Sequence, residues 1–214
     1  NIAAVRNSGA DTVICSCPAC DMMWRHAYPE WAKKLGIEYN ITARHYSEVV
    51  ADRINSGEFA FPEGKGPGGE TTVTWHDSCH LGRVSGVYEA PRDLIKAVPG
   101  TKFVEMSHNR EEAHCCGSVL TLIKEPDVAA DIGEERLNEA VEAGAQKVLA
   151  MCPCCQVQLR ISAEKKNTPV EVVDLAHYAA AALGYEFPDP NPEVQKQWGV
   201  FDRMISLMTP QGFA

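Results

Sequence analysis

The sequence is short of basic charge and of long apolar runs. Its 20 lysines and arginines are outnumbered by 29 aspartates and glutamates, so the formal net charge is −9. This balance argues against a nucleic-acid partner, because polyanions bind basic surfaces. No stretch reaches the roughly 18 consecutive apolar residues of a membrane-spanning helix, and no basic segment followed by an apolar run opens the chain. We therefore expect a cytoplasmic protein with no direct membrane span, at most peripheral to a membrane complex.

Cysteine is too scarce and too clustered for a small disulfide-stapled protein. Nine cysteines occur in 214 residues, whereas such scaffolds contain about 8–10% cysteine. The hydrophobic share of 45% and the charged share of 23% are typical of a globular protein and exclude disordered and collagen-like classes. Adjacent cysteines and C-x-x-C elements indicate metal or redox chemistry in a reducing compartment. The cysteines form the groups Cys15, Cys17 and Cys20; Cys79; Cys115 and Cys116; and Cys152, Cys154 and Cys155.

One segment of the sequence occurs twice. Gly9–Arg25 aligns with Gly144–Arg160 at a constant offset of 135, and seven of the 17 aligned residues are identical. This duplication predicts two homologous halves. The chain opens on Asn1, and residues 2–10 are typical of the end of an amphipathic helix. We therefore expect that upstream sequence is missing and that the first half is incomplete.

Short β-prone runs alternate with helical patterns along the chain. The runs Thr71–His76 and Lys147–Met151 both end close to a cysteine, as does Val13-Ile14. This alternation predicts an α/β fold with mostly parallel sheets, in which ligands bind at the carboxyl ends of the strands. Further strands are expected at 102–105 and 170–173, and helices at 90–98, 128–143, 156–165 and 175–183. The glutamates and arginines of the helix at 128–143 are expected on its polar face.

A segment rich in proline and glycine, Phe61–Glu70, separates the two halves. We predict that residues 1–66 form the C-terminal part of a first repeat and that residues 70–184 form a complete second repeat. Residues 185–214 form a tail that could dock on a partner protein or pack on its own domain. The apolar stripe of this tail consists of Val194, Trp198, Phe201, Ile205 and Met208.

The cysteines of the second repeat are regularly spaced. Cys79 and Cys115 are separated by 35 residues, and Cys116 and Cys152 by another 35. A C-x-x-C element alone is used by zinc sites, redox disulfides and clusters alike. The complete pattern, with Gly117 directly after the adjacent pair and Cys155 at its end, is much more specific.

With the segment His76–Arg83 (HDSCHLGR), these motifs resemble a known family. It is the cysteine-rich CCG domain of heterodisulfide reductases, found in their B-type and D-type components and in related iron–sulfur proteins of glycolate, lactate and quinone-linked systems. The resemblance implies two α/β repeats, with clusters at the carboxyl ends of strands, and a noncubane [4Fe–4S] cluster in a complete repeat. Many members continue the CCG motif with glycines, whereas this chain has Ser118-Val119-Leu120, so we expect a narrower or drier pocket. The implied ligands are Cys79, Cys115, Cys116, Cys152 and Cys155, with Gly117 in the turn.

Other residues are weaker candidates. Cys17 and Cys20 would hold a second [4Fe–4S] cluster or a zinc ion in the first repeat, or else form a structural pair. Cys154 is expected to be a small buried side chain. His80 could relay a proton or donate to a cluster sulfur, since imidazole titrates near neutral pH.

The resemblance implies an oxidoreductase: an iron–sulfur subunit of a multi-subunit complex that reduces a disulfide or transfers electrons. We find neither a dinucleotide-binding fingerprint nor a P-loop, so flavin-type or ferredoxin-type partner subunits would supply the electrons, and a disulfide or thiol would be the substrate. One alternative is an electron relay alone, in a quinone-linked complex. A second alternative is a zinc-stabilised structural or interaction module.

Overall fold

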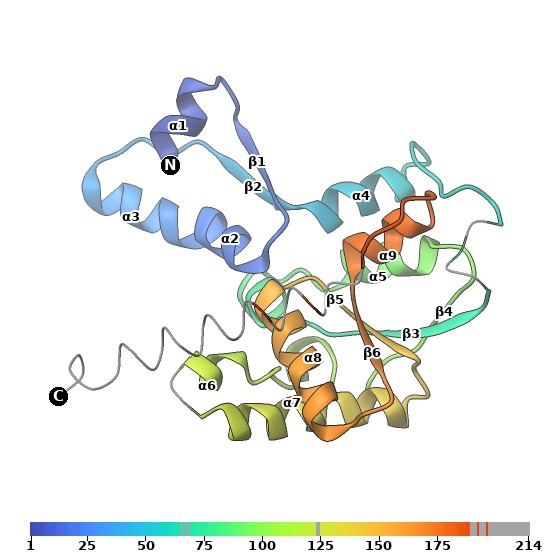
Figure 1. Ribbon diagram of the computed structural model, residues 1–214. Helices are drawn as coiled ribbons and strands as arrows, with labels where there is room; N and C mark the ends of the chain where they lie inside the picture. Colours follow the sequence, from blue (N-terminus) through green and yellow to red (C-terminus); the bar gives the residue numbers. More distant parts are fainter. Residues whose placement is uncertain (65, 67–68, 123–124, 189–191, 193–195, 197–214) are drawn as a thin grey trace.

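A four-stranded parallel sheet organises the second half of the molecule. The structure, a computed structural model, describes residues 1–64, 66, 69–122, 125–188, 192 and 196. The strands lie in the order β4-β3-β5-β6, and every neighbouring pair is parallel (Figure 1). They are β3 (Thr71–Trp75), β4 (Thr101–Phe103), β5 (Lys147–Ala150) and β6 (Glu171–Asp174). The predicted α/β fold with parallel sheets is confirmed.

Helices cover both faces of this sheet. On one face, α5 (Glu89–Ala97) and α9 (Leu175–Ala181) pack around Trp75 and Leu149. On the other face, α7 (Pro126–Glu142) and α8 (Pro153–Lys166) pack around Val148 and Val172. Consecutive residues of β5 thus point into different cores, which is why this strand is apolar without alternation. A short helix, α6 (Ser118–Leu122), follows the adjacent cysteines.

The first half contains a smaller parallel sheet. Strands β1 (Thr12–Cys15) and β2 (Thr42–His45) pair in register from Thr12 with Thr42 to Cys15 with His45. Helix α4 (Tyr46–Asn55) contacts α5, and its Tyr46, Val50 and Ile54 pack on the core beneath α5 and α9. This apolar contact attaches the first half to the second. The helical elements are α1 (Ile2–Asn7), α2 (Pro18–Met22), the π-helical turn η1 (Met23–Ala27), α3 (Tyr28–Leu35) and α4 (Tyr46–Asn55).

The expected elements of the second half lie within three residues of their observed bounds. The largest shift is in α8, which starts at Pro153 instead of 156, because proline suits the first helical turn, where its missing N–H would be unpaired in any case. The expected polar face of 128–143 needs correction, since Arg136 is completely buried and Glu139 is 8% exposed. The apolar stripe of the tail lies outside the described residues, and the repeat boundaries remain a prediction.

No helix among the described residues combines the length and the apolar character that crossing a bilayer requires.

A glycine allows α7 and α8 to approach each other closely. A Cβ atom built on Gly133 of α7 would lie 2.1 Å from Oγ and 2.8 Å from Cβ of Ser162 on α8. It would also lie 3.3 Å from the carbonyl oxygen of Cys116. Real Cβ atoms do not approach other heavy atoms as closely as the two serine distances, so no larger residue fits without moving the helices. Gly133 therefore sets the distance between these helices and the loop that carries the adjacent cysteines.

We predict that Gly133→Ala destabilises the protein. Overpacking a close helix contact costs about 1–3 kcal/mol, which outweighs the gain of about 1 kcal/mol in helix propensity. In a Ser162→Gly background both close contacts with the serine disappear, so the same change should be neutral or stabilising. Urea unfolding of the four variants of this double-mutant cycle measures the difference. An equal cost in both backgrounds would contradict the contact.

Candidate metal centre

Both C-P-x-C elements start a helix directly after a strand. Cys152 follows β5 and is the N-cap of α8, with Pro153 in the first turn. Cys17 follows β1 and is the N-cap of α2, with Pro18 in the first turn. The free N–H groups and the dipole of a helix N-terminus favour a thiolate. The strand-to-helix junction thus places a cysteine at the carboxyl edge of each sheet.

The segment after β3 is held by a buried carboxylate. Asp77, 5% exposed, accepts hydrogen bonds from two nitrogens of Arg92, both at 2.8 Å. It also accepts one from Nε1 of Trp75 at 2.9 Å and one from the backbone N–H of Arg110 at 2.8 Å. Burial opposes ionisation of Asp77, but the hydrogen bonds and the charge of Arg92 hold its pKa below the ordinary value. Asp77 therefore fixes the chain two residues before Cys79.

Cys79 begins a turn of π-helix, η2 (His80–Val84). Such turns occur frequently at functional sites. Arg83 within it donates to the carbonyl oxygens of Glu111 and Ala113, the latter two residues before Cys115. The π-helical turn therefore anchors the loop that carries the adjacent cysteines.

The adjacent cysteines differ in exposure. Cys116 is buried and Cys115 is exposed. Gly117 follows with φ +87°, and its Cβ would lie 2.6 Å from the carbonyl oxygen of Ala129 on α7. Only glycine adopts this turn without strain and without a clash. The backbone N–H of Gly117 donates to Sγ of Cys115 at 3.4 Å.

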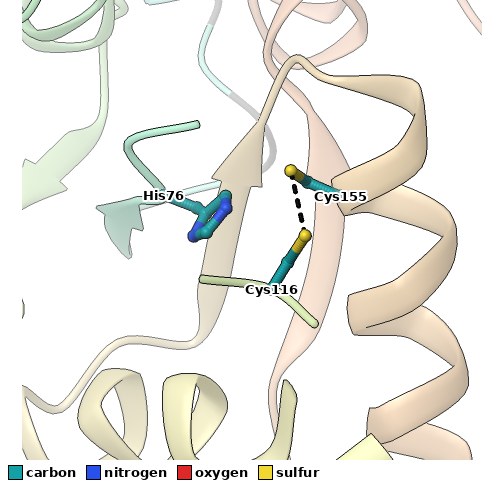
Figure 2. Close-up of side chains that lie close together, drawn as sticks. All are labelled: His76, Cys116 and Cys155. Carbon is teal, nitrogen blue, oxygen red and sulfur yellow. Dashed lines mark hydrogen bonds between the residues drawn. The ribbon is translucent and has the colours of Figure 1, made fainter. Parts of the chain in front are cut away.

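Three distant segments converge on one point (Figure 2). Sγ of Cys116 lies 3.2 Å from Sγ of Cys155 in the first turn of α8. His76, from the end of β3, joins them, and the three ligand atoms lie within 4.8 Å of one another. All three residues are buried. The parallel sheet thus brings together residues that lie up to 79 positions apart in the sequence, as His76 and Cys155 do.

Four of the five predicted ligands line one pocket. Its cavity volume is about 10 Å³, which is room for about one water molecule. The fifth, Cys152, is buried beside it and hydrogen-bonds to Cys154 and Cys155. The lining residues are His76, Asp77, Cys79, Arg83, Ala113, His114, Cys115, Cys116 and Cys155.

The cysteine thiols strongly shift one another's pKa values. Hydrogen bonds from Cys115 and Cys155 hold the pKa of Cys116 far below its ordinary value. Hydrogen bonds from Cys154 and Cys155 lower the pKa of Cys152 to about 3. Burial, together with the neighbouring thiolates, raises the pKa of Cys79. Negative charge on some sulfurs therefore opposes ionisation of the others, and a bound cationic centre would let all of them ionise.

His76 is the histidine beside the sulfurs. Its hydrogen bond with Arg136 determines which ring nitrogen carries the proton. Nε of Arg136 donates to Nδ1 of His76 at 3.2 Å. Because a guanidinium only donates, Nδ1 carries no proton, and the neutral ring holds its proton on Nε2. His76 hydrogen-bonds to Cys116 and helps to lower the pKa of that thiol. Among the described residues, His80 is half-buried in η2 and does not line the pocket.

Some expectations for the remaining cysteines need correction. Cys154 is exposed, because it is the second residue of α8 and faces away from the core. In the first half, Cys17 and Cys20 hydrogen-bond to each other, and burial raises the pKa of the nearby Cys15 to about 11. Within the described part of the chain, this pair belongs to no group of three metal-ligating side chains. Sequence reasoning did not identify Arg136 or Glu139 as buried, because a charged residue in an amphipathic helix ordinarily faces solvent.

Comparisons with known proteins find relatives among the components of oxidoreductases. Residues 73–160 match the family model described as the cysteine-rich domain CCG. The chain is 34% identical over 187 residues to a component of the dihydromethanophenazine:CoB–CoM heterodisulfide reductase of Methanosarcina barkeri, covering 86% of this chain and 44% of that protein. It is 30% identical over 177 residues to a component of the fumarate reductase (CoM/CoB) of Methanothermobacter marburgensis, covering 79% and 33%. It is 26% identical over 193 residues to EtfAB:quinone oxidoreductase of Syntrophomonas wolfei, covering 86% and 26%. The chain thus spans less than half the length of these relatives.

We predict that Asp77→Asn strongly destabilises the protein. The change removes the buried one of the two carboxylates that pair with Arg92 and leaves only the partly exposed Glu105, so the cost should approach the roughly 3–5 kcal/mol of a broken buried ion pair. Asp131→Asn is the matched control, since Asp131 is 61% exposed and pairs with surface Lys166; its cost should be about 1 kcal/mol or less. Urea unfolding at neutral pH compares the two. Equal effects would show that the Asp77–Arg92 pair does not support the site.

Proposed function

Since residues 73–160 form a cysteine-rich CCG domain, as the sequence motifs predicted, we propose that the chain is an iron–sulfur subunit of a multi-subunit, heterodisulfide-reductase-like complex. The observation that carries the proposal is that four cysteines from three segments line one pocket, with a fifth, Cys152, buried beside them. Cys79, Cys115, Cys116, Cys152 and Cys155 would hold a noncubane [4Fe–4S] cluster, since thiolates are the ligands that such clusters prefer. The bound cluster would supply one-electron chemistry.

The buried residues around the sulfurs tune and orient this site. His76 donates from Nε2 toward Cys116, and Arg136 holds the ring in that orientation. Hydrogen bonds to ligating sulfur stabilise the more reduced, more negative state and raise its reduction potential. The surrounding residues Leu137, Val148 and Leu159 are fully buried and keep water away from this side of the cysteines.

The other side of the site is accessible. Cys115 and His114 are both exposed where they border the pocket. A small disulfide or thiol substrate could therefore approach the sulfurs from this side. Arg83, which lines the pocket, would offset the negative charge of a substrate thiolate. The exposure of Cys115 and His114 supports reduction of a disulfide at this pocket, and an electron relay alone is the alternative.

Partner subunits would complete the electron path. Without a dinucleotide-binding fingerprint, the chain depends on flavin-type or ferredoxin-type subunits as donors. All nine cysteines are free in the structure, which fits a reducing, cytoplasmic location, peripheral to any membrane complex. In the first half, Cys17 and Cys20 would take a second cluster or a zinc ion only if further ligands joined them.

We predict that the anaerobically purified chain contains about four irons with matching acid-labile sulfide, as one [4Fe–4S] cluster requires. Cys116→Ser should lose this iron and sulfide, because Cys116 is buried at the centre of the site. Cys15→Ser is the matched control: its thiol is also buried but lies in the first half, so this variant should keep the full content. Iron, sulfide and zinc analysis per chain measures the outcome.

Three results would change the proposal. Zinc without sulfide would overturn it and support a structural or interaction module. About eight irons would place a second cluster in the first half, with four irons in each. Turnover of a small disulfide by the intact cluster with an artificial electron donor would narrow the proposal to a reductase, because it excludes an electron relay alone.

A further inference from the structure

A second group of metal-ligating side chains lies beside the cysteine pocket. His108 and His114 belong to the loop between β4 and α6, and Glu139 belongs to α7. One ligand atom from each of the three residues lies within 4.8 Å of the other two. Nδ1 of His108 is 2.9 Å and Nδ1 of His114 is 2.8 Å from the same oxygen, Oε1 of Glu139. The two imidazole rings stack with their centroids 3.9 Å apart.

A hydrogen bond from Arg136 holds the carboxylate of Glu139 in place on the side away from the histidines. Its other oxygen, Oε2, accepts from Arg136, which is completely buried. The same nitrogen of Arg136 also donates to the carbonyl oxygen of His108 at 2.7 Å. Arg136 thus orients both the carboxylate and one histidine, as outer hydrogen bonds do at protein metal sites. Oε1 of Glu139 is therefore free to contact the two imidazoles.

The geometry suits a divalent cation. In a tetrahedral zinc site with bonds of about 2.0–2.1 Å, ligand atoms lie about 3.3 Å apart, so the observed 2.8 and 2.9 Å would need only a small opening. The imidazole side chains are 47% and 44% exposed and can rotate to provide it. Two histidines and one glutamate are an established set of three zinc ligands, and they leave a fourth position for water.

This group differs from the cysteines in chemistry and in position. Imidazole and carboxylate favour zinc, cobalt and nickel, whereas the thiolates favour an iron–sulfur cluster. We propose that His108, His114 and Glu139 form a separate divalent-cation site of the zinc type, which ties the loop carrying Cys115 and Cys116 to α7. His114 directly precedes Cys115 and lines the pocket, so a cation there would fix one end of the loop. This site goes beyond the proposed function and does not depend on the cluster.

Cobalt(II) is the probe that separates the two sites. Added to the anaerobically purified full chain after chelator treatment, it should bind at about one ion per chain. Its visible spectrum should show ligand-field bands without a thiolate-to-cobalt charge-transfer band, and zinc should displace it. His108→Ala and Glu139→Gln should each weaken binding at least about 10-fold, because each removes or weakens one of three ligands.

The control is His177→Ala, at an exposed histidine of α9 outside both groups; it should bind cobalt like the unaltered chain. Circular dichroism and iron content verify folding, and His108→Ala carries the test if Glu139→Gln unfolds, because His108 is half-exposed. Cobalt that binds only with the charge-transfer band, or that binds both variants as tightly as the control, overturns the proposal. Iron without cobalt binding refutes only this site, whereas cobalt binding without iron refutes only the cluster.

Discussion

The buried carboxylate of Asp77 is the interaction on which the arrangement of the cysteine pocket depends. It joins the segment after β3 to α5 through Arg92, and to the loop before the adjacent cysteines through the backbone of Arg110. Arg92 extends the network to Glu105, at 2.7 and 3.0 Å. Burying these charges is costly in itself, so their value lies in the single arrangement that satisfies every donor and acceptor. That arrangement places Cys79 and the adjacent cysteines at one edge of the sheet.

Arg136 has a corresponding role on the other side of the pocket. It bonds His76, Glu139 and the carbonyl oxygen of His108, so it connects the cysteine group to the two surface histidines. Burial lowers the pKa of this arginine, while the charge of Glu139 acts in the opposite direction. One buried side chain thus orients a sulfur-facing imidazole and a carboxylate that faces solvent-accessible histidines. The proposed iron–sulfur centre and the proposed cation site share this support although they have no ligand in common.

Close packing complements these polar networks. Gly133 lets α8 approach α7, and Gly117 lets the turn after Cys116 approach Ala129. Both glycines act where a side chain would separate the loop from the helices. The positions of the sulfurs are therefore determined by backbone contacts as well as by hydrogen bonds, which is how a site gains rigidity on a scaffold of helices and strands.

The local sequence pattern was sufficient to predict much of the fold and much of the candidate site. Strands such as Lys147–Met151 and the helices of the second half follow from apolar periodicity, and proline after Cys152 marks a helix start. The spacing of Cys79, Cys115, Cys116, Cys152 and Cys155, with the family resemblance, identified the residues that meet around the pocket. These features are properties of neighbouring residues or of the order of motifs, and neither requires knowledge of packing.

By itself, then, the sequence determined the α/β class and the set of cysteines that meet around the pocket. Only the tertiary structure decided that His76 and not His80 faces the sulfurs, that Cys154 points outward, and that Arg136 and Glu139 lie inside. The physical reason is that each of these depends on partners far away in the chain: His76 is 60 residues from Arg136, and His108 is 31 residues from Glu139. Helical periodicity places a charged side chain on a face, but only the opposing surface determines whether that face meets water or a buried partner.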